Sequence, residues 1–206
     1  MARVLREKKS HIRANSLGVR TKYIEKYTDD FDRDLLTHIQ HITAIIDQQL
    51  IPCCVIEENK VFYYKMLADY FRHTTDFFGE NSKEEYVDAI SESLANYRYA
   101  MELGQRHLEP TSPIFLSLVL NYSVFMYDMQ NNVAEATLLA ETAFNRAVQT
   151  MHLLPEDQHK ESTLLLQLLR DNLQLWKHAA AVDEDGVGEE GGGGLTQQDP
   201  EIEPEA

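Results

Sequence analysis

The stretch KVFYYKMLADYFRH carries charged residues along one side of an otherwise apolar and aromatic helical run. Lys65, Asp69, Arg72, His73 and Asp76 form one narrow stripe at 3.6 residues per turn. A lysine and an arginine two turns apart can converge on one phosphate group. The open alternative is an internal salt-bridge ladder in which the aspartates neutralise the two cations. The stripe predicts an anion site, such a ladder, or both together.

Two asparagines fall on leucine-rich faces of two further helical stretches. Asn121 has Leu120 and Val124 beside it, and Asn172 lies within about 60° of Leu168 on the helical wheel. An amide buried there without partners costs about 1–3 kcal/mol. Either each amide is bonded to protein backbone, or the two faces are walls of a ligand groove. A carboxamide carries donors and an acceptor, so it can hold the backbone of an extended peptide.

These residues lie on helices that are expected from the apolar periodicity and from the scarcity of proline and glycine between residues 20 and 180. The expected helices cover residues 20–50, 60–78, 83–106, 113 to about 130, a fifth stretch ending at about 151 and a sixth ending at about 177. No strand-like alternation bounded by turns occurs in the sequence. Because the loops are short, we predict an all-α fold with antiparallel neighbouring helices.

Start and stop signals mark the boundaries of these helices. A serine or asparagine supplies each start signal, whereas glycine or proline marks an end or an opening. The residues are Ser82 with Glu85 as a capping box, Ser112 before Pro113, Asn132 with Glu135, Gly79 as a stop and Pro155 as an opening. Residues 10–22 are expected to form a loop.

The charge of −15 is unevenly distributed along the 206 residues. Residues 1–26 hold eight Lys/Arg and two acids, whereas residues 181–206 hold nine acids and no basic residue. A surface that is acidic over most of its extent repels phosphates, so we predict no nucleic-acid binding. The glycine- and acid-rich end cannot offset its ordering entropy. We therefore predict a helical domain over residues 1–180 and a disordered acidic tail over residues 181–206.

Other classes of site have little support in the sequence. The adjacent Cys53 and Cys54 are expected to be reduced, and His38 with His41 lacks a third metal ligand. There is no glycine-rich phosphate loop, no nucleophile elbow and no HExxH motif. We predict a non-enzymatic protein without metal or cofactor. Without an apolar run long enough to span a bilayer, the expected location is the cytoplasm, with the nucleus left open.

Three segments resemble one known family. KESTLLLQLLRDNLQLW is similar to the C-terminal signature of 14-3-3 proteins, NKVFYYKMLADYFRH to their basic-stripe helix, and EPTSPIFLSLVLNYSVFMYDMQN to their seventh helix. The resemblance runs from about residue 23 to residue 177. It implies a cup-shaped, dimeric, all-helical adaptor that binds phosphoserine or phosphothreonine segments of other proteins. The 14-3-3 proteins are among the phospho-motif readers that use arginine clusters.

The resemblance also implies roles for individual residues, carried over position by position. Lys65 corresponds to a groove lysine, Arg72 to a phosphate-clamping arginine, and His73 to a phosphate-contacting tyrosine. Asn121 and Asn172 correspond to the asparagines that hold the ligand backbone. Asp128 stands where the family has a groove glutamate, and the ligand-facing apolar wall corresponds to Leu120, Val124, Leu168 and Trp176.

Departures from the family pattern predict a weakened site. The family's first two helices and most of its third have no counterpart, and with them go a second arginine, another lysine and the surface for a partner subunit. The loss of that arginine is expected to reduce the binding free energy by about 2–3 kcal/mol, which weakens phosphopeptide binding roughly 30- to 150-fold. A protonated His73 is expected to recover part of this below about pH 6.5. Phe115 and Ser117 replace a usual arginine and glycine.

Two functions remain open at this point. The first is a phosphoprotein adaptor in reduced form. The second is a helical scaffold that binds unphosphorylated partners or acts through mixed dimers with full-length relatives. An upstream extension of the chain would restore the ordinary family pattern.

Overall fold

The computed structural model describes residues 19–78, 82–153 and 159–185. In this part of the chain every regular element is a helix, which confirms the predicted all-α class. The principal helices are α2 (Val19–Ile45), α4 (Glu57–Thr74), α5 (Lys83–His107), α6 (Pro113–Asp128), α7 (Val133–Thr150) and α8 (His159–Asp185). Shorter turns are a π-helical turn (Ile46–Leu50), α3 (Ile51–Cys53) and 3-10 turns at Thr75–Phe77 and Met151–Leu153.

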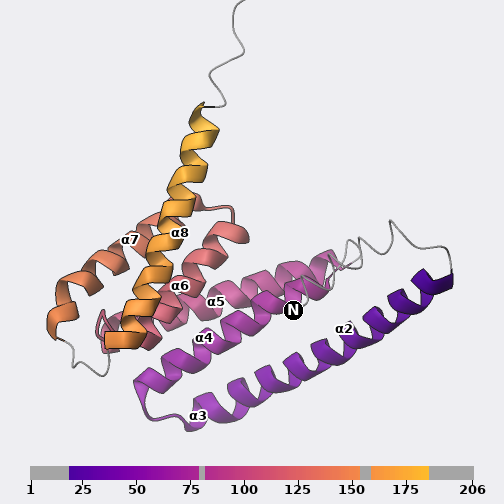
Figure 1. Cartoon of the computed structure of the whole chain (residues 1–206). Coiled ribbons are helices and arrows are strands. Elements are labelled where there is room, and N and C mark those ends of the chain that lie inside the picture. The colour runs from indigo at the N-terminus through magenta and orange to yellow at the C-terminus, as the bar shows by residue number, and fades with distance from the viewer. Residues whose placement is uncertain (1–18, 79–81, 154–158, 186–206) are drawn as a thin grey trace, which may run out of the picture.

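The helices pack mainly against their neighbours in sequence (Figure 1). Helices α4 and α5 form a long antiparallel pair, and α2 runs along one side of it. At the other end of the molecule, α6, α7 and α8 pack on one another, and α6 also contacts both α4 and α5. Because α6 reaches all of these elements, it connects the α4–α5 pair to the carboxy-terminal helices.

The core is centred on α6. Phe115, Leu118 and Phe125 of this helix are buried, together with Tyr97 of α5 and Leu169 of α8. A helix that is apolar around most of its circumference belongs in the interior, where it can bury every face. This central position explains why α6 can present polar side chains to the α4–α5 pair while it packs on α7 and α8.

Small residues allow the helices around α6 to approach closely. The buried side of α7 carries four alanines at helical spacing: Ala136, Ala140, Ala143 and Ala147. On α5, a Cβ atom added at Gly104 would lie 2.9 Å from Cδ2 of Phe115. Phe115, predicted to depart from the family pattern, is therefore a core residue that needs a glycine opposite it.

Two of the three predicted side-chain caps are confirmed. Ser112 Oγ accepts a hydrogen bond from the Phe115 N–H at 3.5 Å, and Asn132 Oδ1 accepts one from the Glu135 N–H at 3.3 Å. The capping box at Ser82 is wrong, because this residue precedes α5 without any side-chain cap bond. With ψ at 43°, the backbone of Ser82 departs farther from the extended conformation of a typical N-cap than Asn132, with ψ at 72°, or Ser112, with ψ at 128°.

The bounds of the first two helical stretches differ from the prediction by a few residues. The first helical stretch continues through the π-helical turn and Pro52 to Cys53, because a proline is tolerated at the first positions of α3. The α-helical part of the next stretch runs from Glu57 to Thr74. The Thr74 and Thr75 hydroxyls donate to carbonyl oxygens one turn back, which accompanies the change to a 3-10 turn. The predicted stop at Gly79 lies outside the described residues.

Helix α8 extends farther than predicted. It continues past Lys177 to Asp185, five residues into the segment predicted to be a tail. The alanine run at residues 179–181 favours continuation, since alanine has the highest helix propensity. Residues 186–206 and the predicted opening at Pro155 lie outside the described residues. At the other end, α2 begins at Val19, within the segment predicted as a loop.

None of the described helices combines the length and the apolar character that crossing a membrane requires.

Candidate functional site

The centre of the candidate site is an ion pair on α4. Lys65 Nζ lies 2.8 Å from Asp69 Oδ2, one helical turn away, and the two side chains are only 14% and 19% exposed. A pair with so little exposure is screened less by salt than a surface pair. This ion pair is one of the contacts in the internal salt-bridge ladder that the sequence predicts as an alternative.

Asp69 also accepts hydrogen bonds from two other helices. The Tyr97 hydroxyl of α5 donates to Asp69 Oδ1 at 2.5 Å. The Asn121 amide of α6 donates from Nδ2 to both carboxylate oxygens, at 3.0 and 2.9 Å. Because a carboxylate only accepts, the amide must turn its nitrogen toward Asp69. Asn121 is therefore bonded to a side chain of another helix, and its carbonyl oxygen is directed away from that contact.

Tyr97 is the residue of this network that sequence reasoning missed. It is fully buried and stacks on Tyr122, with ring centroids 5.2 Å apart. Burial, followed by the adjacent Asp69 carboxylate, raises the pKa of Tyr97 far above the usual tyrosine value, so its hydroxyl remains a donor. The only signal in the sequence is that a buried tyrosine hydroxyl needs a partner.

Arg72 lies next to this network on the same helix. Its Nη2 is 3.3 Å from His73 Nε2. Its Nε is buried and has no hydrogen-bond partner in the described structure. An arginine always carries its proton and its charge, and an unmet buried donor costs about 1–3 kcal/mol. The unmet N–H therefore favours a rearrangement of the Arg72 side chain that gives it an acceptor, and an anion is the strongest acceptor.

His73 lies at the surface beside Arg72. Partial burial of the ring, and next the Arg72 charge, lower the pKa of His73, while Asp69 and Asp76 oppose that change. In neutral solution the imidazole is thus uncharged, and the positive charges of the site are those of Lys65 and Arg72.

The residues predicted to form the apolar wall occupy different environments. Leu120 and Val124 are half-buried against the core, and Leu168 is 42% exposed on α8. Trp176 is only 3% exposed and stacks on Tyr127, with centroids 5.0 Å apart. Asp128 is exposed as the last residue of α6.

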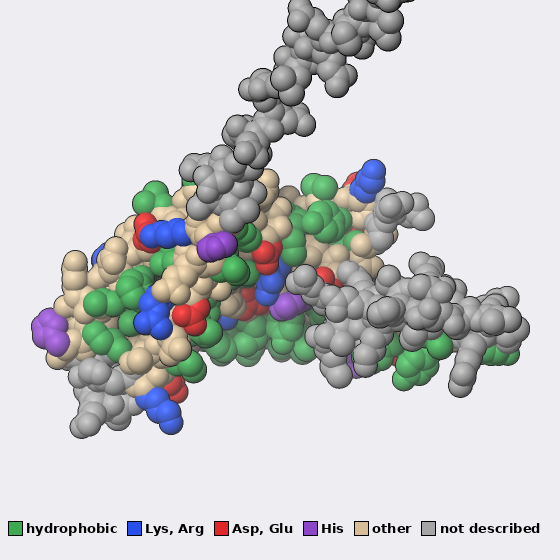
Figure 2. Space-filling model, turned by 45° about the horizontal axis from the view of Figure 1, so that its top comes forward, with side chains coloured by type: hydrophobic (Ala, Val, Ile, Leu, Met, Phe, Trp, Pro, Cys, Tyr) green, Lys and Arg blue, Asp and Glu red, His purple; other side chains and the backbone are tan. Residues whose placement is uncertain are grey.

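The structure joins some predicted site residues directly and leaves others as predictions. Lys65 and Asn121 meet at Asp69, with Arg72 and His73 adjacent on α4. Asn172 is half-buried on α8, which packs on α6. That Asn172 and the apolar wall face the same ligand as Arg72 stays a prediction. Figure 2 shows basic, acidic and histidine side chains together near the middle of one face, with hydrophobic side chains around them.

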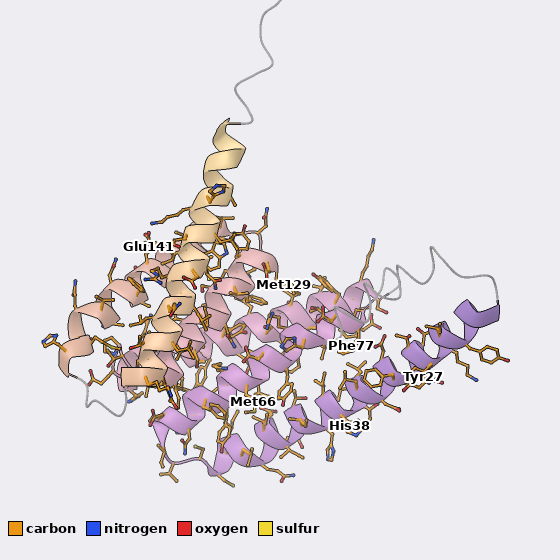
Figure 3. The ribbon with its side chains drawn as sticks, in the orientation of Figure 1. Tyr27, His38, Met66, Phe77, Met129 and Glu141 are labelled. Atoms are coloured by element: carbon orange, nitrogen blue, oxygen red, sulfur yellow. The ribbon has the colours of Figure 1, made fainter. Side chains whose placement is uncertain are left out.

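Other polar residues singled out in the sequence have local partners. Ser117 Oγ donates to the Ile114 carbonyl oxygen at 2.9 Å, and His38 Nδ1 lies 2.6 Å from the Asp34 carbonyl oxygen. His38 projects from α2 on the side away from α4 (Figure 3). Cys53 and Cys54 are free thiols. Within the described ranges, no group of three or more His, Cys, Asp or Glu side chains is placed to hold a metal ion.

Comparisons with known proteins all lead to one family. The chain matches the family profile described as 14-3-3 protein over residues 1–177, a match that begins 22 residues before the predicted resemblance. It is 41% identical to 14-3-3 protein 9 of Solanum lycopersicum over 170 residues, which cover 82% of this chain and 63% of the relative. Identity to 14-3-3 protein eta of Bos taurus is 40% over 167 residues, covering 80% and 67%.

A relative from Schizosaccharomyces pombe has a similar sequence identity. The checkpoint signal transducer rad24 of Schizosaccharomyces pombe is 39% identical over 170 residues, covering 82% of this chain and 61% of that protein. The chain therefore spans about two-thirds of the length of the relatives it matches.

Proposed function

We propose, from the premise that this chain belongs to the 14-3-3 family, that it is an adaptor which binds phosphoserine or phosphothreonine segments of other proteins. Membership of the family supports the adaptor role in general. The use of the Lys65 and Arg72 region for the phosphate is our proposal.

The observation that carries this proposal is the unmet donor of Arg72. Its buried Nε–H has no hydrogen-bond partner among the described residues, and Arg72 lies on the same face of α4 as Lys65. A phosphate monoester offers three acceptor oxygens and nearly two negative charges. One such group would accept hydrogen bonds from the guanidinium and attract the Lys65 ammonium, whereas a neutral ligand offers weaker acceptors.

The amide of Asn121 is suited to the ligand backbone. Its nitrogen is held by Asp69, so its carbonyl oxygen points away from that carboxylate and can accept a hydrogen bond from a ligand. An extended peptide presents such a donor at each backbone N–H. A fixed amide loses little freedom when the ligand binds, which favours affinity without selecting side chains.

We further propose that binding by this chain alone is weak. Among the described residues, Arg72 is the one arginine that we propose to bind the phosphate. A second arginine would add about 1.5–3 kcal/mol, or roughly 10- to 150-fold in affinity. An affinity in the low-micromolar range would contradict the weakness but leave the phosphate dependence standing.

Calorimetric titration with a family-consensus phosphoserine peptide and its unphosphorylated counterpart tests the proposal. We expect binding of the phosphorylated peptide only, and loss of it in Lys65→Glu, because that change places a second carboxylate beside Asp69. Lys60→Glu is the matched control, since Lys60 pairs with Glu57 near the start of the same helix. Lys65→Gln, which removes the charge without adding repulsion, separates binding from misfolding.

Equal binding of both peptides, or unchanged binding in Lys65→Glu and Lys65→Gln, would contradict the proposal. Circular dichroism melting of each variant shows whether the helical fold is retained. If Lys60→Glu reduced binding as much as Lys65→Glu, the effect would be one of overall charge.

A second candidate function is supported by a different surface. Tyr23, Tyr27 and Phe31 follow one another at four-residue spacing on α2 and are 73%, 75% and 38% exposed. An exposed aromatic stripe of this kind marks a protein interaction surface. The chain would then act as a scaffold, through mixed dimers with full-length relatives or with unphosphorylated partners. Lys65→Glu would matter little for that activity.

A further inference from the structure

We propose that His73 competes with the phosphate for Arg72, and that ligand binding is therefore coupled to uptake of a proton by His73. The inference rests on the proposed function and concerns the regulation of the same site. It makes His73 an affinity-determining residue whose effect reverses between alkaline and acidic solution.

The contact between the two side chains fixes the state of the imidazole. Arg72 Nη2 can only donate, so His73 Nε2 at 3.3 Å must present its lone pair. The ring proton then resides on Nδ1, and His73 is the neutral tautomer. In this state the imidazole is an acceptor that occupies one of the donors needed by the phosphate.

Protonation of Nε2 reverses the contact. The imidazolium has two N–H donors and no acceptor, so it faces Arg72 as a second cation and releases Nη2. Arg72 Nη2 and the imidazolium N–H can then both donate to one anion. The proton thus converts a competitor of the phosphate into a ligand for it.

The charged groups around His73 determine whether its pKa lies above or below the usual value before a ligand binds. Arg72 opposes the proton, and Asp69 and Asp76 favour it. Asp69 already accepts from Lys65, from Tyr97 of α5 and from Asn121 of α6, which moderates its pull on the imidazole. Without ligand the pKa of His73 is held below its usual value by partial burial and by Arg72.

A bound phosphate dianion raises the pKa of His73, because an adjacent opposite charge favours the charged form. Binding then takes up a proton between the pKa values of the free and bound states. Affinity rises as the pH falls through the bound-state value, by up to about tenfold per pH unit, and levels off below the free-state value. Protonation of the phosphate itself, with a pKa of about 6, acts in the opposite direction.

The test compares the full chain with His73→Phe, a substitution at an exposed position that removes both the acceptor and the proton. Calorimetric titration with the phosphoserine peptide is run from about pH 8 to about pH 5.5. The ratio of the two affinities cancels the titration of the phosphate. We expect His73→Phe to bind tighter near pH 8 and the unchanged chain to bind tighter near pH 5.5. His41→Phe, at an exposed position on α2, is the matched control.

Proton uptake gives an independent readout. Titrations in two buffers of different ionisation enthalpy count the protons taken up, and the unchanged chain should exceed His73→Phe by a fraction of a proton near pH 6.5. An affinity ratio that is constant with pH, or equal proton uptake, would overturn the inference alone if both proteins bind the peptide. Failure of both proteins to bind at every pH would overturn the proposed function as well.

Discussion

Asp69 is the acceptor around which the candidate site is organised. It receives the Lys65 ammonium from its own helix and donors from α5 and α6. These contacts hold Lys65 and Asn121 in place before a ligand arrives, so binding has less side-chain freedom to remove. An acidic residue such as Asp69 can therefore support an anion site, because it orients Lys65 and Asn121 for a ligand.

The Asp69→Asn variant tests this role. An asparagine keeps the shape but removes the charge, leaving Lys65 without compensation in a largely buried position. We expect the free energy of unfolding to fall by about 1.5–3 kcal/mol, measured by urea denaturation. Asp30→Asn is the control, because Asp30 pairs with an exposed Arg33 on α2, and we expect it to change stability by less than about 0.5 kcal/mol. Similar small losses in both variants would show that Asp69 has no organising role.

At this scale, local spacing is the part of the site that the sequence predicts. The Lys65–Asp69 pair follows from residues one turn apart on one helix. The contacts of Asn121 and Tyr97 with Asp69 depend on how α4, α5 and α6 pack against one another. The local sequence pattern of each helix does not predict that packing. The resemblance to the family predicted Asn121 as a site residue but did not reveal that its amide nitrogen is already bonded to Asp69.

At the scale of the helices, the serines before α5 and α6 show that the same N-cap residue forms a cap bond at one helix and not at the other. Both Ser82 and Ser112 precede a predicted helix. Only Ser112, followed by Pro113, has its side chain on the first turn, where it accepts from the Phe115 N–H. Since Phe115 is buried against Gly104, this cap fixes the start of α6 beside the core.

Alanine substitutions at the two serines distinguish a cap from a residue that only resembles one. Ser112→Ala removes the acceptor of the Phe115 N–H and should lower the free energy of unfolding by about 0.5–2 kcal/mol. Ser82→Ala removes no cap bond and should stay within about 0.5 kcal/mol. Urea denaturation of both variants provides the measurement. An equal loss in the two would mean that Ser82 caps α5 in solution.

Helix types were predictable here, whereas helix ends were less so. The apolar period that identifies α6 or α8 extends over many residues. The continuation of the first stretch through Pro52, and of α8 to Asp185, rests on a π-helical turn and on an alanine run. The predicted end of the last helix at about Lys177 was wrong because a run of three alanines outweighs the acidic, glycine-rich composition that follows it.

At the scale of the whole molecule, the chain is strongly acidic, whereas the candidate site contains two cations and two carboxylates. The formal charge of −15 repels other anions, while Lys65 and Arg72 are two cations on one face of α4. We therefore expect no nucleic-acid binding, and we expect the proposed recognition of a phosphate to depend on short-range contacts. The ion pair between Lys177 and Glu141 joins α8 to α7 and helps to fix α8 against the rest of the bundle.

The aromatic stripe on α2 leads to a prediction about assembly. Tyr27 is 75% exposed, and burying an aromatic side chain in an interface contributes about 1.5–3 kcal/mol. Tyr27→Glu should therefore weaken association with a full-length relative, such as 14-3-3 protein eta, by roughly tenfold or more in sedimentation velocity experiments. Leu138→Glu is the control, because Leu138 is 65% exposed on α7, at the other end of the molecule. If the two variants associate alike, the stripe is not the contact surface, and a mixed dimer formed through α2 is ruled out. A selective loss in Tyr27→Glu with unchanged phosphopeptide binding would separate assembly from ligand binding on two different faces of one chain.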